Sequence, residues 1–204
     1  MTDLFRGPMP IQYETTLVTH IHDKIASAMF EATDDEALNK VIAEFTRSFT
    51  IESPRIVGSM ESLQPSEQIE RTVQNDGRYS RLGVGYAEKI IDFTFMVPVE
   101  GDVSLLQLTP NTAPFGTGIK GELSLSRDAI RYTYSARSAY ATEQQLSQDI
   151  SNDLKTLRRH IEALEGWVNH WNSQLEAQVR PLVVQRRAEL QKSKTLGQSL
   201  RISF

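Results

Sequence analysis

The sequence predicts an α+β fold with helices at the N-terminus, a small antiparallel β-sheet or sandwich in the middle, and a long C-terminal helical segment. Three observations predict it. Apolar residues recur at three- and four-residue steps in roughly the first fifty residues, and they alternate with polar residues from about residue 91 to residue 136. After residue 141 the helical spacing returns. Each change of period indicates a change of secondary structure.

The N-terminal pattern predicts two helices. The first, over about residues 13–31, carries an apolar stripe made of Leu17, Val18, Ile21, Ile25, Ala28 and Met29. A second helix is predicted over about residues 34–48, because Thr33 offers a cap and the following Asp34, Asp35 and Glu36 offer first-turn acids. Both helices therefore have one face to bury.

Strands are predicted between about residues 50 and 136. In Ile91–Val99 the odd positions are apolar, so Phe93 and Phe95 are expected on a buried face and Thr94 on the opposite face. Pro98 cannot donate a backbone hydrogen bond, so pairing should stop there or the strand end should lie at a sheet edge. Alternating residues on either side of Ser126–Ala129 predict a hairpin. Residues 1–140 thus form the predicted α+β body.

Residues 141–204 are predicted to form a helical hairpin or coiled-coil segment. Thr142 and Gln145 have the spacing of a capping box. A heptad seam follows, made of Ile150, Leu154, Leu157, Ile161, Leu164, Val168, Trp171 and Leu175. Pro181 removes a helical hydrogen bond, so we expect a break or kink between Asn172 and Pro181. A returning helix, the β body or another chain would cover the seam.

The motifs that usually bind ligands lack their structural context. Gly116–Gly121 matches the glycine pattern of dinucleotide sites, but no strand precedes it and no helix follows, so a conformational role and no cofactor are expected. His20 and His22 are two residues apart on a helix and therefore diverge, which argues against a metal site. No local motif supplies catalytic residues. We expect no enzyme, and a small hydrolase or nuclease with a spatially assembled site is the second alternative.

Composition bears on compartment and partners. The chain lacks cysteine, an apolar run long enough to span a membrane and a signal-like N-terminus, so a cytoplasmic protein without a membrane partner is expected. The net charge is −4, yet residues 176–204 hold six basic residues and two acidic ones. The candidate contacts to an anion or effector are Arg180, Arg186, Arg187, Lys192 and Lys194. Pairing with the acidic body and binding to nucleic-acid phosphates both remain open.

A protein interface is the other candidate site. Its residues lie on the predicted seam or beside it, and they are Leu157, Ile161, Leu164, Trp167, Val168 and Trp171. Tryptophan side chains four residues apart share one helix face, where they either fill the core or form a hot spot for a partner.

Two stretches together resemble a known group of bacterial proteins. Ile91–Val99 followed by Glu100-Gly101-Asp102 and Leu105–Thr112 resembles "(I/V)PFxGDxxLFxxxPS". Trp171–Leu175, Val184–Leu190 and Leu196–Leu200 resemble "FNxxL…RRxxLLxxxxxxxSLGxPL". Both stretches occur in this order in the N-terminal regions of phage-defence proteins with restriction-endonuclease-like or TIR effector domains at their C-termini. Pro181 departs from that pattern, and the chain stops at Phe204, where the effector would begin.

The resemblance implies a sensor, scaffold or oligomerisation region and lends the chain no catalytic residue. We therefore expect a non-catalytic regulatory, sensor or oligomerisation module of an antiviral defence effector, either as part of a longer protein or beside a separate effector. Its partner would be a protein, namely a second copy or an effector domain or subunit. The alternative is a nucleic-acid-binding accessory module that uses the basic C-terminal helix.

Overall fold

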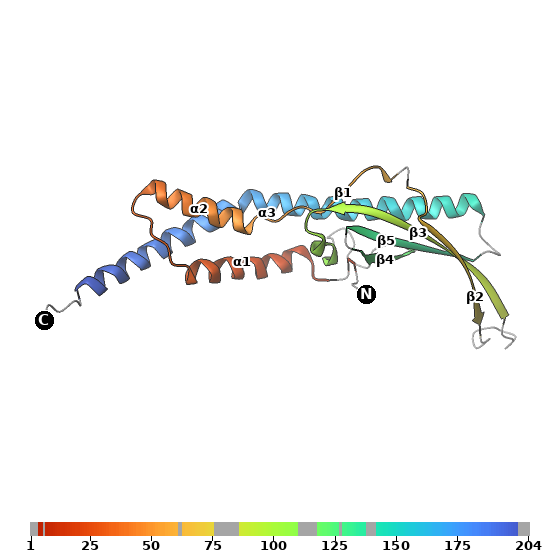
Figure 1. Ribbon diagram of the computed structural model, residues 1–204, viewed down its shortest axis with the longest axis horizontal. Coiled ribbons are helices and arrows are strands. Elements are labelled where there is room, and N and C mark those ends of the chain that lie inside the picture. The colour runs from red at the N-terminus through yellow and green to blue at the C-terminus, as the bar shows by residue number, and fades with distance from the viewer. Residues whose placement is uncertain are drawn as a thin grey trace. The chain divides into compact units, whose positions relative to one another are not determined.

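The computed structural model confirms the α+β class, with an antiparallel five-stranded sheet and a long C-terminal helix. It describes residues 4–5, 7–60, 63–75, 86–109, 118–126, 128–137 and 142–199. The helices are α1 (Pro10–Ser27), α2 (Asp35–Phe49) and α3 (Glu143–Ser199), with a short 3-10 helix η2 (Val103–Gln107). The strands are β1 (Arg55–Ile56), β2 (Glu67–Asn75), β3 (Tyr86–Glu100), β4 (Glu122–Leu125) and β5 (Ala129–Arg137). Figure 1 labels the helices and strands along the chain.

The chain divides into two compact units. Unit 1 consists of Met1–Met9 and Ser53–Glu165, and unit 2 consists of Pro10–Glu52 and Gly166–Phe204. Helix α3 therefore gives its first part to unit 1 and its last part to unit 2. This division differs from the predicted boundary after residue 140, because the predicted body and the helical segment are each shared between the units.

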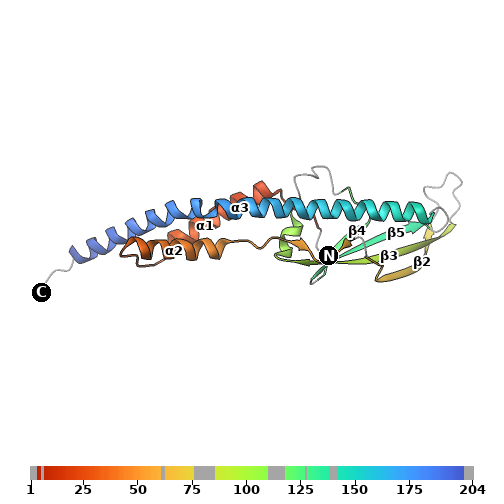
Figure 2. The same ribbon diagram turned by 90° about the horizontal axis from the view of Figure 1, so that it is seen from above.

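Unit 1 is built on the long strand β3. Strands β1 and β2 pair with the two ends of β3, β5 pairs along its other edge, and β4 follows β5, all antiparallel. The predicted hairpin is confirmed, since Leu125 pairs with Ile130 across its turn. Within unit 1, the first part of α3 lies along β4 and β5 in both Figure 1 and Figure 2.

The predicted alternation of β3 is confirmed at three apolar positions and wrong at one polar position, while Ile91 and Phe93, also expected on the buried face, are only half-buried. Phe95, Val97 and Val99 are buried. Thr94, expected on an exposed face, is only 4% exposed, and its hydroxyl lies 3.3 Å from that of Thr133 on β5. Pro98 pairs with the first residue of β5, so the β3–β5 ladder does end there as expected.

An N-terminal segment that the apolar periodicity did not reveal completes unit 1. Leu4 and Phe5 are buried, and the amide of Phe5 donates a 2.8 Å hydrogen bond to the carbonyl of Leu106 in η2. The Phe5 ring packs 5.3 Å, centroid to centroid, from that of His160 on α3. Two of the residues that carry the family resemblance shape η2: Gly101 has a φ of 88°, and Asp102 caps the helix by accepting from the amide of Ser104 at 3.0 Å.

Unit 2 is a three-helix assembly of α1, α2 and the last part of α3. Both predicted N-terminal helices are confirmed, although α1 starts and ends earlier than expected. It can start at Pro10 because proline is tolerated in the first turn of a helix. The cap of α2 is Asp34 and not the expected Thr33, because the Asp34 carboxylate accepts a hydrogen bond from the amide of Ala37 at 2.8 Å. The shared core consists of Ile21, Ile25, Ala32, Leu38, Ile42, Trp171, Leu175, Val179 and Val183. Figure 2 shows α1 and α2 beside this part of α3.

The expected break before Pro181 and the helical hairpin are both wrong, because α3 is a single helix of 57 residues that contains Pro181. Proline inside a helix costs about 3 kcal/mol, whereas each fully buried aliphatic side chain contributes about 1.5–3 kcal/mol. Val179 and Val183, on either side of Pro181, are fully buried. Pro181 and Ala177 are exposed, so water can satisfy the carbonyl that proline leaves without a donor.

Candidate functional site

A buried carboxylate joins α3 to the glycine-rich connection in unit 1. Asp153 is only 3% exposed, and one of its oxygens, Oδ2, accepts hydrogen bonds from the amides of Lys120 and Gly121, each at 2.9 Å. The same oxygen accepts from the Tyr132 hydroxyl at 2.8 Å. Successive backbone amides of this kind form an anion-binding concavity. Here the chain's own carboxylate occupies it.

This geometry explains the part of Gly116–Gly121 that the structure describes. A Cβ on Gly121 would collide with the Tyr132 ring and would lie 2.8 Å from the carbonyl oxygen of Thr133. Gly118 has a φ of 67°, which side chains disfavour. Strand β4 follows directly, where a dinucleotide site needs a helix. Gly116 lies outside the described residues, and the described glycines serve a tight turn and a close approach.

A second carboxylate extends this network toward the surface. Asp149 accepts a hydrogen bond from the Tyr134 hydroxyl at 2.8 Å and pairs with the Lys120 ammonium at 2.9 Å. The hydrogen bond from Lys120, followed by that from Tyr134, lowers the pKa of Asp149. Burial and the bond to Asp149 raise the pKa of Tyr134 to about 12. Burial, then the bond to Asp153, raises the pKa of Tyr132 well above its ordinary value.

The network of Asp149, Asp153, Tyr132, Tyr134 and Lys120 was not identified from the sequence. Its signal was present: two acids four residues apart stand beside the apolar seam, and two tyrosines occupy alternate positions of a strand. The packing of α3 against β5 is what brings the acids within hydrogen-bond distance of the tyrosines. Each group has a partner inside the chain, so the network fastens the helix to the sheet.

The predicted partner-interface residues lie in the chain's own interior. Leu157, Ile161, Leu164, Val168 and Trp171 are each no more than 3% exposed. Trp167 is half-buried within unit 2, where its indole nitrogen donates a hydrogen bond to Glu14 and its ring lies 6.1 Å from that of Tyr13. The seam is therefore covered by other elements of the same chain, and not by a returning C-terminal helix.

Four of the five predicted cationic contacts are paired inside unit 2. Arg180 pairs with Glu176 at 2.7 Å, and Lys194 pairs with Glu31 at 3.2 Å. Arg186 donates to the carbonyl of Ala28 at 3.1 Å and pairs with Glu189 at 3.2 Å. Lys192 is exposed and has no ion pair within the part of the chain that the structure describes.

Arg187 is held less completely than the other three paired cations. It contacts Asp35 and the carbonyl of Thr33, both at 3.4 Å, and its Nε is buried without a hydrogen-bond partner among the described residues. An unsatisfied buried donor costs about 1–3 kcal/mol. The terminal guanidinium nitrogens, whose two contacts are long, are the part of Arg187 that could donate to a further acceptor.

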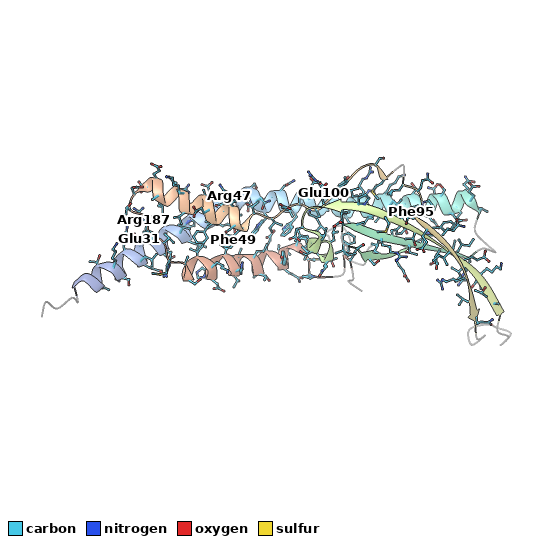
Figure 3. All side chains as sticks on the ribbon, viewed as in Figure 1. Glu31, Arg47, Phe49, Phe95, Glu100 and Arg187 are labelled. Carbon is cyan, nitrogen blue, oxygen red and sulfur yellow. The ribbon has the colours of Figure 1, made fainter. Side chains whose placement is uncertain are left out.

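Arg187 borders a groove of about 530 Å³ between residues 29–33, which connect α1 to α2, and residues 187–194 of α3. We call it the loop groove. Met29, Phe30, Ala32 and Leu190 form its apolar wall, and Glu31, Arg187 and Lys194 form its charged rim. Figure 3 labels Glu31 and Arg187, which lie close together where the connecting loop meets α3.

Two findings concern function classes. Across the described ranges, no three histidine or carboxylate side chains gather as a metal site would require. No helix there has the length and apolar character needed to cross a membrane.

Comparison with known proteins gave no relative: no family model matches the chain, and neither does any curated protein or solved structure.

Proposed function

We propose that the chain is a non-catalytic regulatory module that acts through protein contacts. In this proposal, the loop groove and the adjoining end of α3 bind an acidic, apolar-faced segment of a partner protein. The observation that carries the proposal is the exposure of this end of unit 2. Residues 191–196 are helical and all exposed, so tertiary packing stabilises these turns little, and helical turns with little packing are marginal in water.

Three large apolar side chains are exposed in this part of unit 2. Met29 is 81% exposed, Leu196 53% and Val184 46%, and the first of them lines the loop groove. Large side chains of this kind at one end of a helical unit are typical of a surface that a partner covers. The groove provides the concavity into which an apolar anchor of the partner would fit.

Charge favours an acidic partner over a second copy. Arg187 and Lys194 line the loop groove with a single acid, Glu31, and Lys192 lies on the adjoining end of α3. Two copies that met through this surface would therefore bring an excess of like charges together. A partner carboxylate in the groove would instead accept from the terminal guanidinium nitrogens of Arg187, and a second acidic residue of the partner would pair with Lys192. Pairing within the chain already satisfies Arg180 and Arg186, which leaves few free cations for nucleic-acid phosphates. The resemblance to phage-defence proteins would make the partner an effector domain or subunit.

The proposal is tested by selecting peptides from a random library displayed on phage against the immobilised chain. We expect enriched peptides to combine acidic with large apolar residues, and we expect Met29→Glu or Leu196→Glu to weaken their binding at least tenfold. Ile11→Glu is the matched control, because Ile11 is 66% exposed on α1 outside the groove, and it should leave binding unchanged.

Three other outcomes would overturn the proposal. A selection without enrichment, or with binding indifferent to the Met29 and Leu196 variants, would remove the surface as a docking site. A dimer in sedimentation velocity that Leu196→Glu dissociates would make the surface a contact between copies. Salt-dependent DNA or RNA binding that Lys192→Glu abolishes would favour the nucleic-acid alternative.

A further inference from the structure

The apolar seam of α3 is incompletely covered at its start. Leu157, Ile161 and Leu164 are no more than 2% exposed, whereas Ile150 and Leu154, the first two residues of the seam, are only half-buried. These two side chains line a pocket of about 390 Å³ within unit 1, and Met60, Leu63 and Phe95 complete its apolar wall. We call it the sheet pocket. Figure 3 labels Phe95, which lies on β3.

The polar network explains why a pocket lies on this flank of the helix. Asp149 and Asp153 face the tyrosines of β5, so hydrogen bonds hold that side of α3 against the sheet. Ile150 and Leu154 are each one residue further along and project about 100° around the helix. They stand over Phe95, whose ring lies 5.8 Å from that of Tyr132. The network closes one flank of the helix and leaves the other open.

The rim of the sheet pocket is cationic. Lys155 and Arg158 border it, together with the hydroxyls of Ser147 and Ser151, and no acidic residue is among the described residues that line it. Lys155 is exposed, and it has no ion pair within the described parts of the chain. Small-molecule sites measure about 300–1,000 Å³ and combine an apolar wall with a few polar groups that orient the ligand. The sheet pocket falls within this range of volumes, and it likewise combines an apolar wall with a few polar groups at its rim.

We propose that the sheet pocket binds a small anionic amphiphile. The apolar tail would lie against Ile150, Leu154 and Phe95, and a carboxylate or phosphate head group would pair with Lys155 and Arg158 at the rim. An ammonium and a guanidinium at one mouth favour a head group with several acceptor oxygens. This binding would make unit 1 a ligand-responsive part of the protein, and it does not depend on the loop groove of unit 2.

The test is isothermal titration of the full chain with four probes below their micelle concentrations. Dodecanoate and dodecyl phosphate carry the two candidate head groups, whereas dodecanol and dodecyltrimethylammonium carry the same tail without an anion. We expect at least one anionic probe to bind at least tenfold more tightly than dodecanol. The preferred anion identifies the head group. Lys155→Met should weaken anion binding about fivefold to tenfold, because it removes the charge and keeps the apolar stem.

Lys24→Met is the matched control, since Lys24 is exposed on α1 in unit 2 and should not affect binding. Leu154→Trp, which fills the pocket, should abolish binding of every probe while the circular dichroism spectrum stays helical. If Leu154→Trp unfolds the chain, Lys155→Met still decides, because Lys155 is exposed and its replacement leaves the core intact. Equal affinities for anionic and neutral probes, affinities unchanged by Lys155→Met, or no binding by any probe would each overturn the proposal.

Discussion

The hydroxyl of Tyr132 on β5 lies 2.8 Å from Oδ2 of Asp153 on α3, and this bond crosses from the sheet to the helix in a region closed to solvent. The carboxylate oxygen that accepts it also accepts two backbone amides of the glycine-rich connection. Strand β5, helix α3 and the glycine-rich connection are thus joined at one carboxylate oxygen.

Replacing Asp153 should be among the most damaging polar substitutions in the chain. Asp153→Ala leaves two part-buried amides and the buried Tyr132 hydroxyl without an acceptor, so we expect the free energy of unfolding to fall by about 3–5 kcal/mol. Urea unfolding followed by circular dichroism measures this change. Asn152→Ala is the control, because Asn152 is exposed and adjacent on the same helix, and its effect should stay within about 0.5 kcal/mol. Equal losses for the two variants would refute the anchoring role of Asp153.

Alkaline conditions should weaken the same contact. In the folded chain the pKa of Tyr134 is raised to about 12, and that of Tyr132 is raised further from the ordinary value of about 10. A raised pKa means that the folded state holds the proton more tightly, so this stabilisation is complete below about pH 10 and is lost as pH rises through the folded value. Urea midpoints should therefore fall between about pH 10 and about pH 12. The double variant Tyr132→Phe/Tyr134→Phe should show a clearly smaller fall.

Substitutions on both faces of β3 should lower the free energy of unfolding, whereas a simple buried and exposed alternation would predict an effect on one face only. Phe95 is 5% exposed, so Phe95→Ala should cost about 3–5 kcal/mol of unfolding free energy. Thr94→Ala should cost about 1 kcal/mol, since Thr94 is also buried and its hydroxyl pairs with Thr133. Lys89→Ala, at an exposed ion pair of the same strand, should cost little. A denaturant melt in which Thr94→Ala matched the Lys89 control would restore the expectation that Thr94 faces solvent.

Charges placed in the seam should unfold unit 1. Leu157→Asp and Leu164→Asp put carboxylates at positions no more than 1% exposed, so we expect loss of cooperative unfolding at every protein concentration. Circular dichroism and sedimentation velocity on the same samples measure both folding and mass. If these variants stayed folded and only converted an oligomer to a monomer, the seam would be an interface between chains.

Gly121 should be irreplaceable for a reason unrelated to nucleotides. Gly121→Ala forces a methyl group onto the Tyr132 ring and the Thr133 carbonyl, so we expect a loss of several kcal/mol in urea unfolding. Gly118→Ala meets no neighbour and should cost only about 1–2 kcal/mol, from the left-handed backbone. The unaltered chain should give no heat on titration with ATP, NAD or FAD. Micromolar binding that Gly118→Ala abolished would contradict the conformational role.

The sequence predicted the elements better than their associations. The stripe around Ile21 and Ile25, the alternation around Phe95 and the seam around Leu157 each predicted a local structure that is present. The expected break at Pro181 is wrong, because the burial of Val179 and Val183 offsets the local cost of proline in the helix. The role of Asp153 was not predicted, because two acids beside a seam do not reveal which groups they bind, and the partners of Asp153 lie some twenty or more residues away. Contacts of that separation are set by packing, which periodicity does not encode.

The interleaved connectivity of the two units bears on the order in which a growing chain can fold. Helices α1 and α2 emerge from the ribosome early, yet the part of α3 that covers them belongs to residues 166–204, and residues 53–165 intervene. A two-helix fragment with Ile21, Ile25, Leu38 and Ile42 uncovered must therefore wait while unit 1 is synthesised. During that interval those side chains are available to chaperones or to other nascent chains. Unit 2 is expected to be the last part of the chain to fold, and its folding rate should reflect the closure of a loop of that length.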